Sequence, residues 1–268
     1  MHIYRINFLF LMLFATSNAF TAYYPTSSWE ISSPVDQQVR TDNVDALVNL
    51  AFLDDSTQAV VVIKNGKIIS EKYAEGYDKN SHGTSWSMAK SYYAALIGIS
   101  IDRGEIGGLD DKVGDYLTYF NDERSEITIR DLLDMSSGLD FPKDEHETMF
   151  FQEDHLKYAM GVGVEKSAGL KFEYNNVNSM LLGDILIATT GKKADVLLKE
   201  RILDPIGVTD YKLWKDENGN VLTYCCVDMS ARDYSKIGLL FSRNGNWDGK
   251  QLISKQYIDE TFQVVWNI

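Results

Sequence analysis

A serine and a lysine that could act together chemically stand three residues apart in the run Ser87-Met88-Ala89-Lys90. On a helix, this spacing places the hydroxyl and the ammonium one turn apart on the same face. A serine hydroxyl is a weak nucleophile until a base takes its proton. Lysine can be that base where burial or a neighbouring positive charge lowers its pKa. The spacing therefore predicts Ser87 as a nucleophile and Lys90 as its base.

The segment around Ser87 has the pattern of a helix start. Apolar residues at helical spacing run from Met88 to Ile99, and we expect the helix to begin near Ser85 or Ser87 and to stop at Gly104. Backbone N–H groups at a helix start lack intrahelical partners and can stabilise an oxyanion. Because a Ser-x-x-Lys pattern is short, the alternative is that both side chains face solvent without a role.

A second candidate element is Tyr174-Asn175-Asn176, a Tyr-x-Asn pattern. It can supply a phenol that moves protons and an amide that orients a substrate or the lysine. Tyr119 begins a rival match, but it lies in a charged, Tyr-rich stretch and is interpreted as a packing residue. Tyr174 comes just before a predicted helix, so we predict Tyr174 as the proton relay and Asn176 as a substrate-binding residue.

Other catalytic schemes lack their residues. The sequence has no Gly-x-Ser-x-Gly elbow and no His-Glu-x-x-His zinc motif, and we expect neither a metal nor an organic cofactor. Cys225 and Cys226 are adjacent, with their Cα atoms expected about 3.8 Å apart. An ordinary disulfide needs roughly 4.4 Å or more. We therefore interpret the two cysteines as small packing residues rather than as a bridge.

The elements around these residues predict a sheet-containing body with a helical insertion. Residues 58–73 form two apolar runs joined by Asn65-Gly66, which favours a tight β-hairpin. Helical patterns then dominate the chain from about residue 110 to 210. The predicted fold class is α/β, an antiparallel sheet flanked by helices with an inserted all-α domain.

The domain boundaries follow from the same pattern. We expect residues 20–108 and 225–268 to form the α/β domain and residues 109–224 to form the helical domain. Expected helices begin at Thr128, with a capping box and an end at Gly138, and at Val177, with an end at Gly191. Further helices are expected over residues 230–241 and 254–262.

Charge and composition exclude some partners. The 268 residues carry 26 basic and 39 acidic side chains, a net charge of -13. Phosphate binding needs clustered Lys and Arg, so we expect no nucleic-acid partner.

The first nineteen residues have the pattern of a secretory signal peptide. A short start with one basic side chain precedes an apolar run, and Ser17-Asn18-Ala19 supplies small residues for cleavage. No later segment is long and apolar enough to span a membrane. We expect a periplasmic or secreted protein without a membrane span in its mature chain.

Five short segments, taken in order, resemble the serine β-lactamase and penicillin-recognising superfamily. They are Ser87-Met88-Ala89-Lys90 and residues 127–138, 172–176, 204–207 and 225–238. Their order and spacing match over most of the chain after the predicted signal peptide. The chain resembles the class C-like branch of esterases, D-alanyl-D-alanine carboxypeptidases and 6-aminohexanoate-dimer hydrolases, and its paired cysteines look most like the last group.

The resemblance implies a role for each predicted site residue. Ser87 would be acylated, and Lys90 would be its base partner. Tyr174 would relay protons to the leaving group and the deacylating water, and Asn176 would orient the site. The family also has a third element, Lys-Thr-Gly or His-x-Gly on a late strand, and no such tripeptide follows Tyr174. We therefore expect that the sequence is truncated at its C-terminus.

The sequence thus predicts a serine hydrolase that cleaves amide or ester bonds through an acyl-enzyme on Ser87. Small amides, β-lactams, D-Ala peptides and esters all suit the predicted residues. The alternative is a non-catalytic, penicillin-binding-like fragment that binds a ligand or partner, because the third element is missing.

Overall fold

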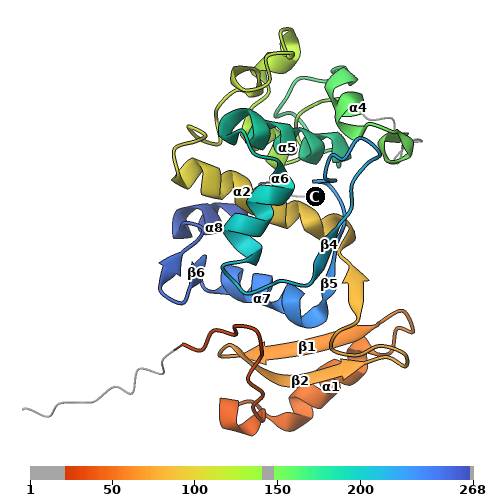
Figure 1. Cartoon of the computed structure of the whole chain (residues 1–268), viewed down its shortest axis with the longest axis vertical. Coiled ribbons are helices and arrows are strands. Elements are labelled where there is room, and N and C mark those ends of the chain that lie inside the picture. Colours follow the sequence, from red (N-terminus) through yellow and green to blue (C-terminus); the bar gives the residue numbers. More distant parts are fainter. Residues whose placement is uncertain (1–21, 141–147, 266–268) are drawn as a thin grey trace, which may run out of the picture.

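A computed structural model describes residues 22–140 and 148–265 of the chain. Helices flank three small antiparallel sheets, which confirms the predicted fold class (Figure 1). The signal peptide predicted over residues 1–19 lies outside the described residues, and the domain boundaries stay a prediction. No helix among the described residues is long and apolar enough to cross a membrane.

The N-terminal part of the described chain is a hairpin backed by a helix. Strands β1 (Ala59–Lys64) and β2 (Lys67–Tyr73) pair antiparallel, and α1 (Thr41–Ala51) packs against them. Asn65 and Gly66 adopt φ of 53° and 83°, as a turn with two left-handed central residues requires. The predicted hairpin is therefore confirmed, and Figure 1 shows it at the lower end of the molecule.

A three-stranded sheet leads into the central helix. Its order is β3 (His82–Thr84), β5 (Val227–Ser230) and β4 (Tyr211–Leu213), all antiparallel. The central strand β5 thus holds β3, which immediately precedes the Ser-x-x-Lys segment. Strand β4 lies within residues 109–224, so the segment expected to be all-helical contributes one strand to this sheet.

The central helix α2 (Ala89–Asp102) follows a single turn of 3₁₀-helix, η2 (Trp86–Met88). Nine residues of α2 are buried, because it packs against α5 (Asn176–Thr190) on one side and α6 (Ala194–Leu198) further along. Figure 1 shows α2 crossing the middle of the molecule below α5. The helix that carries Lys90 is therefore part of the main hydrophobic core.

The remaining elements surround this centre. They are η1 (Val35–Gln37), η3 (Val113–Asp115), η4 (Glu123–Glu126), α3 (Ile129–Leu133), η6 (Thr148–Phe151), α4 (His155–Gly161), the π-helical turn η7 (Lys199–Leu203), α7 (Ala231–Ser242), β6 (Asn246–Trp247), β7 (Lys250–Gln251) and α8 (Lys255–Thr261). The capping box predicted at Thr128 and Asp131 is present, but α3 ends at Leu133 rather than at Gly138. The chain turns early because Met135 adopts a left-handed φ of 57°.

The cysteines correct one prediction. Cys225 and Cys226 are joined in a disulfide, with their Cα atoms 3.5 Å apart. The Cα–Cα distance of roughly 4.4 Å or more describes most disulfides. A bridge between adjacent residues falls outside that range, because the peptide bond fixes the distance between their Cα atoms. Cys226 has a left-handed φ of 94°. Both residues are also buried, as expected of packing residues.

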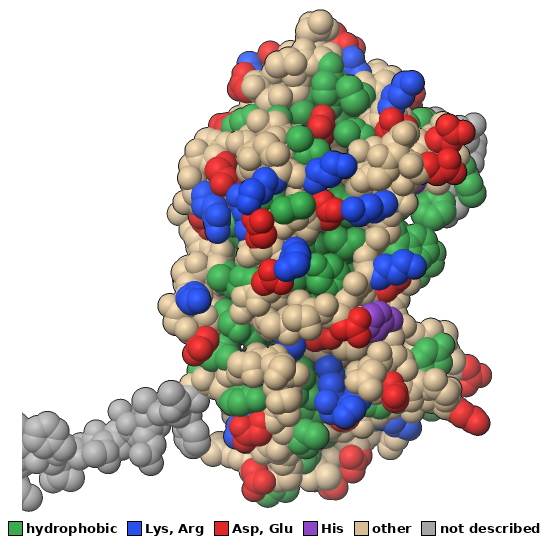
Figure 2. Space-filling view, in the orientation of Figure 1, with side chains coloured by type: hydrophobic (Ala, Val, Ile, Leu, Met, Phe, Trp, Pro, Cys, Tyr) green, Lys and Arg blue, Asp and Glu red, His purple; other side chains and the backbone are tan. Residues whose placement is uncertain are grey.

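The charged side chains are spread over the surface. In the face drawn in Figure 2, Lys and Arg side chains lie among Asp and Glu side chains rather than in one basic patch.

Candidate active site

Ser87 stands at a sharp turn from strand to helix. Just after β3, the backbone N–H of Ser85 donates to the carbonyl of Val227 at 2.9 Å, and the N–H of Val227 donates to Ser85 Oγ at 2.9 Å. Trp86 then adopts a left-handed φ of 46°, which is uncommon for a residue with a side chain. The chain reverses into η2, and Ser87 is exposed at the start of the helical segment.

The three predicted catalytic side chains meet at the oxygen of Ser87. Lys90 Nζ lies 3.2 Å from Ser87 Oγ, and the hydroxyl of Tyr174 donates to the same oxygen at 2.6 Å. Lys90 Nζ also lies 4.9 Å from the centre of the Tyr174 ring. The serine oxygen therefore has an amine and a phenol within hydrogen-bond distance, although the phenol is 87 residues away in sequence.

Lys90 is unusually poor in negative neighbours. Burial lowers the pKa of Lys90 to about 7. Within residues 22–140 and 148–265, no carboxylate forms an ion pair with it. Its second described hydrogen bond goes to the backbone carbonyl of Tyr224, at 2.7 Å. A lysine in this setting is available as a neutral amine near pH 7, the state that can accept a proton.

The two asparagines after Tyr174 have different contacts. Asn175 caps α5: its Oδ1 accepts from the N–H of Val177 at 2.9 Å, and its Nδ2 donates to the carbonyl of Leu139 at 3.1 Å. Asn176 is the first residue of α5, and its buried Oδ1 has no hydrogen-bond partner among the described residues. A buried acceptor without a partner is suited to a donor from a ligand. The structure does not join Asn176 to Ser87 or Lys90 by a described hydrogen bond.

Two residues near Lys90, Tyr224 and His155, were not predicted from the sequence. The hydroxyl of Tyr224 lies 3.0 Å from Nδ1 of His155, and each residue is 3% exposed. The ring centre of Tyr224 lies 5.7 Å from Lys90 Nζ. The two residues are 69 positions apart, and neither belongs to a motif with local spacing, so no signal in the sequence joins them.

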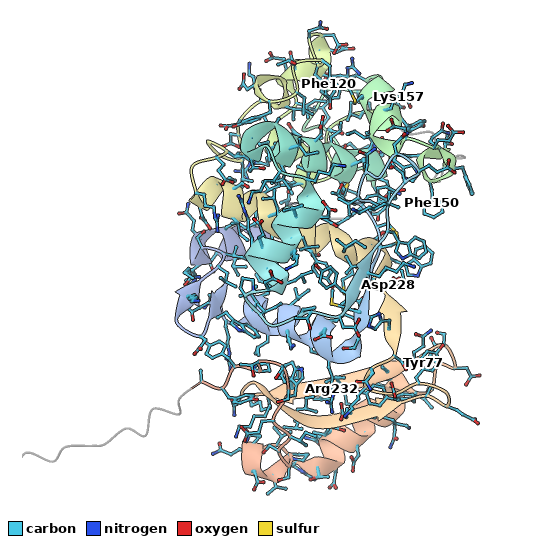
Figure 3. All side chains as sticks on the ribbon, in the orientation of Figure 1. Tyr77, Phe120, Phe150, Lys157, Asp228 and Arg232 are labelled. Atoms are coloured by element: carbon cyan, nitrogen blue, oxygen red, sulfur yellow. A yellow bond between two sulfur atoms is a disulfide. The ribbon has the colours of Figure 1, made fainter. Side chains whose placement is uncertain are left out.

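An acidic residue organises the strand ends next to the nucleophile. Asp228 on β5 accepts from the hydroxyl of Thr84 at 2.8 Å and from Nε1 of Trp214 at 2.9 Å. The rings of Trp214 and Trp86 lie 6.2 Å apart, and Trp86 is exposed. Asp228 is paired with Thr84 of β3 and Lys212 of β4, and Figure 3 labels it beside these strands. These contacts fix the backbone that presents Ser87 from two strands at once.

The rival candidate lies elsewhere. Tyr119 donates its hydroxyl to Asp184 at 2.8 Å and its ring stacks edge-on against buried Phe120. Its half-buried position on the helical side agrees with a packing role. The described residues also contain no group of three or more His, Cys, Asp or Glu side chains placed to hold a metal ion.

A family model and several curated proteins match this chain. A family model described as Beta-lactamase matches residues 53–236. The N-acetylmuramyl-L-alanine amidase of Bacillus subtilis strain 168 is 27% identical over 177 residues, which cover 55% of this chain and 40% of the amidase. The D-aminopeptidase of Brucella anthropi is 28% identical over 178 residues, which cover 59% of this chain and 33% of the peptidase.

A similar fold is found among solved structures. A protein from Bacillus anthracis, provisionally assigned as a 6-aminohexanoate-dimer hydrolase, superposes with a TM-score of 0.73 at 21% identity over 91% of this chain and 68% of its own. The likeness at this identity is one of fold. The chain spans less than half the length of the two curated relatives.

Proposed function

Since the chain belongs to the β-lactamase family, we propose that it is a serine hydrolase that cleaves amide or ester bonds through an acyl-enzyme on Ser87. The observation that carries the proposal is the meeting of Lys90 and Tyr174 at Ser87 Oγ, at 3.2 Å and 2.6 Å. A nucleophile within hydrogen-bond reach of its base is the arrangement that covalent catalysis requires.

The proposed acylation uses neutral Lys90 as the base. Lys90 Nζ takes the proton from Ser87 Oγ as that oxygen bonds to the substrate carbonyl carbon. The tetrahedral intermediate collapses when the C–N or C–O bond of the leaving group breaks. The leaving group takes a proton through the hydroxyl of Tyr174, which is replenished from Lys90. The products are an ester on Ser87 and a free amine or alcohol.

Deacylation runs through the same groups. A water molecule gives a proton to neutral Lys90, directly or through the hydroxyl of Tyr174, as its oxygen bonds to the ester carbonyl carbon. The tetrahedral intermediate then collapses when the bond between that carbon and Ser87 Oγ breaks, and Ser87 Oγ takes back the proton from Lys90. The backbone N–H of Ser87, in the first turn of the helical segment, is the proposed donor to the oxyanion in both steps. The unpartnered Oδ1 of Asn176 is the proposed acceptor for a substrate N–H.

The names of the relatives favour amides over other substrates. An amidase, an aminopeptidase for D-residues and a dimer hydrolase for an aminohexanoate are each named for cleaving an amide bond. We therefore propose small amides, including peptides of D-amino acids, as the first substrates to examine, with β-lactams and esters as further candidates. We also propose that the protein is exported, on the basis of the signal peptide predicted over residues 1–19.

Turnover of a defined panel tests this function. The parent chain, Ser87→Ala and Ser91→Ala would be assayed against a D-alanyl amide, an aminohexanoate dimer, a β-lactam and a short p-nitrophenyl ester. Ser91 is an exposed serine on the adjoining helix α2, so its loss controls for the substitution itself. The proposal predicts hydrolysis of at least one compound by the parent and Ser91→Ala, reduced at least about 10³-fold in Ser87→Ala.

Two outcomes would count against a hydrolase. Equal rates in the parent and Ser87→Ala would show that Ser87 is not the nucleophile. A folded parent that binds these compounds without turning any of them over would favour the alternative, a ligand-binding relative without catalysis.

A further inference from the structure

We propose that Tyr224 and His155 form a buried positioning pair, which holds the carbonyl of Tyr224 against Lys90 and so aims the amine at Ser87. The proposal rests on the proposed function, because it concerns how the base of that reaction is oriented. Neither residue touches Ser87, so both act through Lys90.

The contacts form a continuous path to the nucleophile. Nδ1 of His155 lies 3.0 Å from the hydroxyl of Tyr224, the carbonyl of Tyr224 accepts from Lys90 Nζ at 2.7 Å, and Lys90 Nζ lies 3.2 Å from Ser87 Oγ. His155 and Tyr224 are each 3% exposed. The path therefore begins at two buried side chains and ends at the exposed Ser87.

The path matters because it can set the direction of the lone pair on neutral Lys90. A neutral lysine has two N–H groups and one lone pair. When one N–H is committed to the carbonyl of Tyr224, rotation about the end of the side chain is restricted. The lone pair can then be directed at the hydroxyl of Ser87, which is the orientation that proton transfer needs.

His155 itself is held firmly. It is the first residue of α4, where Asp154 is the N-cap, and its backbone N–H donates to Asp216 at 3.0 Å. Asp216 also accepts from the backbone N–H of Asn220 at 2.8 Å. The ring of Phe150 lies 6.2 Å from the His155 ring, and Figure 3 shows Phe150 on the side of the molecule that also carries Asp228. The backbone of His155 is thus held at the start of α4, with the ring of Phe150 beside the imidazole.

Burial and the neighbouring carboxylates shift the pKa of His155 in opposite directions. Burial lowers the pKa of His155, while the carboxylates of Asp216 and Asp154 act in the raising direction. Among the described residues, Lys90 and Tyr224 are the other titratable groups along the path. A neutral imidazole can accept the Tyr224 hydroxyl at Nδ1 when its proton is on Nε2, and this bond needs no change in charge at neutral pH.

The backbone on either side of Tyr224 has its own supports. The hydroxyl of Thr223 donates to the carbonyl of Ser179 at 2.6 Å, and the N–H of Trp214 donates to the carbonyl of Cys226 at 3.1 Å. Loss of the Tyr224 hydroxyl should therefore shift the carbonyl locally and leave the fold intact. This makes the pair testable by substitution.

The test is the pH profile of Ser87 acylation by an activated p-nitrophenyl ester, with each variant checked for folding by circular dichroism. In Tyr224→Phe and His155→Leu, we expect the plateau rate to fall about 10-fold, because the lone pair is less well aimed. The midpoint should move to lower pH, because the charged ammonium loses an acceptor. His155→Asn, whose amide can replace Nδ1, should recover part of the rate, and the double variant should be no slower than either single one.

Tyr257→Phe is the matched control. The hydroxyl of Tyr257 donates to the carbonyl of Ala94 on α2 at 2.7 Å, and the residue is buried. The substitution therefore also removes one buried tyrosine hydroxyl, here from a contact with the helix that carries Lys90. We expect the parent profile from this variant. If Tyr224→Phe and Tyr257→Phe lower the acylation rate equally, Tyr224 and His155 support the fold in general and do not position Lys90.

Two further results would overturn the positioning role of Tyr224 and His155. One is a parent-like plateau and midpoint in Tyr224→Phe. The other is a midpoint that moves to higher pH, because it would mean that water had entered and that burial, rather than the carbonyl, had been lost. If the ester labels no residue of the parent, or labels one other than Ser87, the proposed function itself fails, and this outcome is distinct from both.

Discussion

Among single residues, the proposed mechanism depends most on Lys90, whose charge is set by burial. Lys90 has no described carboxylate partner, and its two hydrogen bonds go to Ser87 Oγ and the carbonyl of Tyr224. A buried ammonium without a counter-charge loses its proton more readily than an exposed one. Lys90 is therefore a candidate base that is partly neutral near pH 7.

The rate of Ser87 acylation should follow the titration of this lysine. Because the pKa of Lys90 is lowered to about 7, the rate should rise with pH through a midpoint near that value and then level off. Since the cause is burial rather than a nearby charge, raising the salt concentration should leave the midpoint almost unchanged. Stopped-flow release of p-nitrophenol from an activated ester would measure both effects. A midpoint near the ordinary lysine value of 10.5 would contradict the account.

Some of this site could be predicted from sequence and some could not. Ser87 and Lys90 share one helical turn, so their spacing alone brings them together. Tyr174 needed both a motif and a family resemblance, because 87 residues separate it from Ser87. Tyr224 and His155 belong to no motif, and only the packing of α4 against α5 brings His155 to the site. Long-range contacts of this kind carry no local pattern.

At the scale of elements, the helix that carries the site is anchored at its far end. Glu105 follows α2, and its carboxylate accepts two bonds of 2.8 Å from the guanidinium of Arg201 on η7. The same guanidinium donates to Ser100 Oγ at 3.0 Å, and Arg201 is buried. This bidentate pair ties the end of α2 to the helical side of the molecule.

Glu105→Gln should destabilise the protein by about 2 kcal/mol at pH 7, because it leaves a buried guanidinium without its counter-charge. The value is below that of a fully buried pair since the Glu105 side chain is 25% exposed. Arg201 lowers the pKa of Glu105, so this contribution is present above the unfolded-state pKa and is lost as pH falls through the folded-state value. Urea unfolding of both proteins at pH 7 and at about pH 3 would measure the difference.

A surface pair provides the comparison for that experiment. Lys112 and Glu126 form an ion pair whose side chains are 52% and 69% exposed. Glu126→Gln should therefore leave the free energy of unfolding close to that of the parent. Equal effects of the two substitutions, or a Glu105→Gln effect that does not shrink at low pH, would rule out a special role for the buried pair.

The elements were predictable where local chemistry decides them. The Asn65-Gly66 turn and the cap at Thr128 both have the conformations that their residues favour. The early end of α3 depends on a left-handed Met135, which its residue type does not favour. Strand β4 is three residues long and exists because it pairs with β5, so no periodicity could reveal it.

At the scale of the whole molecule, the hairpin and α1 form a separate lower layer. Val44, Val48 and Ile69 make a small hydrophobic cluster of their own, apart from the main core. The layer packs on the main core through Ile68 of β2. It is also joined to Arg232 of α7, whose Nε donates to Glu71 of β2 at 2.8 Å. Figure 3 shows Arg232 where the lower layer meets the rest of the protein.

Because the small cluster buries few side chains, the amides of α1, β1 and β2 should exchange with solvent faster than those of α2 and α5. Glu71→Gln should speed exchange over residues 41–73 further, since it weakens the attachment to Arg232, and should leave α2 and α5 unchanged. Hydrogen exchange followed by mass spectrometry would resolve these segments. Uniform acceleration across the chain would show that the two layers open as one unit.

Intact-protein mass spectrometry after exposure to a fluorophosphonate, an activated ester and a penicillin would show whether Ser87 becomes covalently acylated. The proposed mechanism predicts a single adduct with at least one reagent, mapped to the peptide that contains Ser87, present in Ser91→Ala and absent from Ser87→Ala. An adduct that survives Ser87→Ala, or no adduct on a folded parent chain, would contradict it.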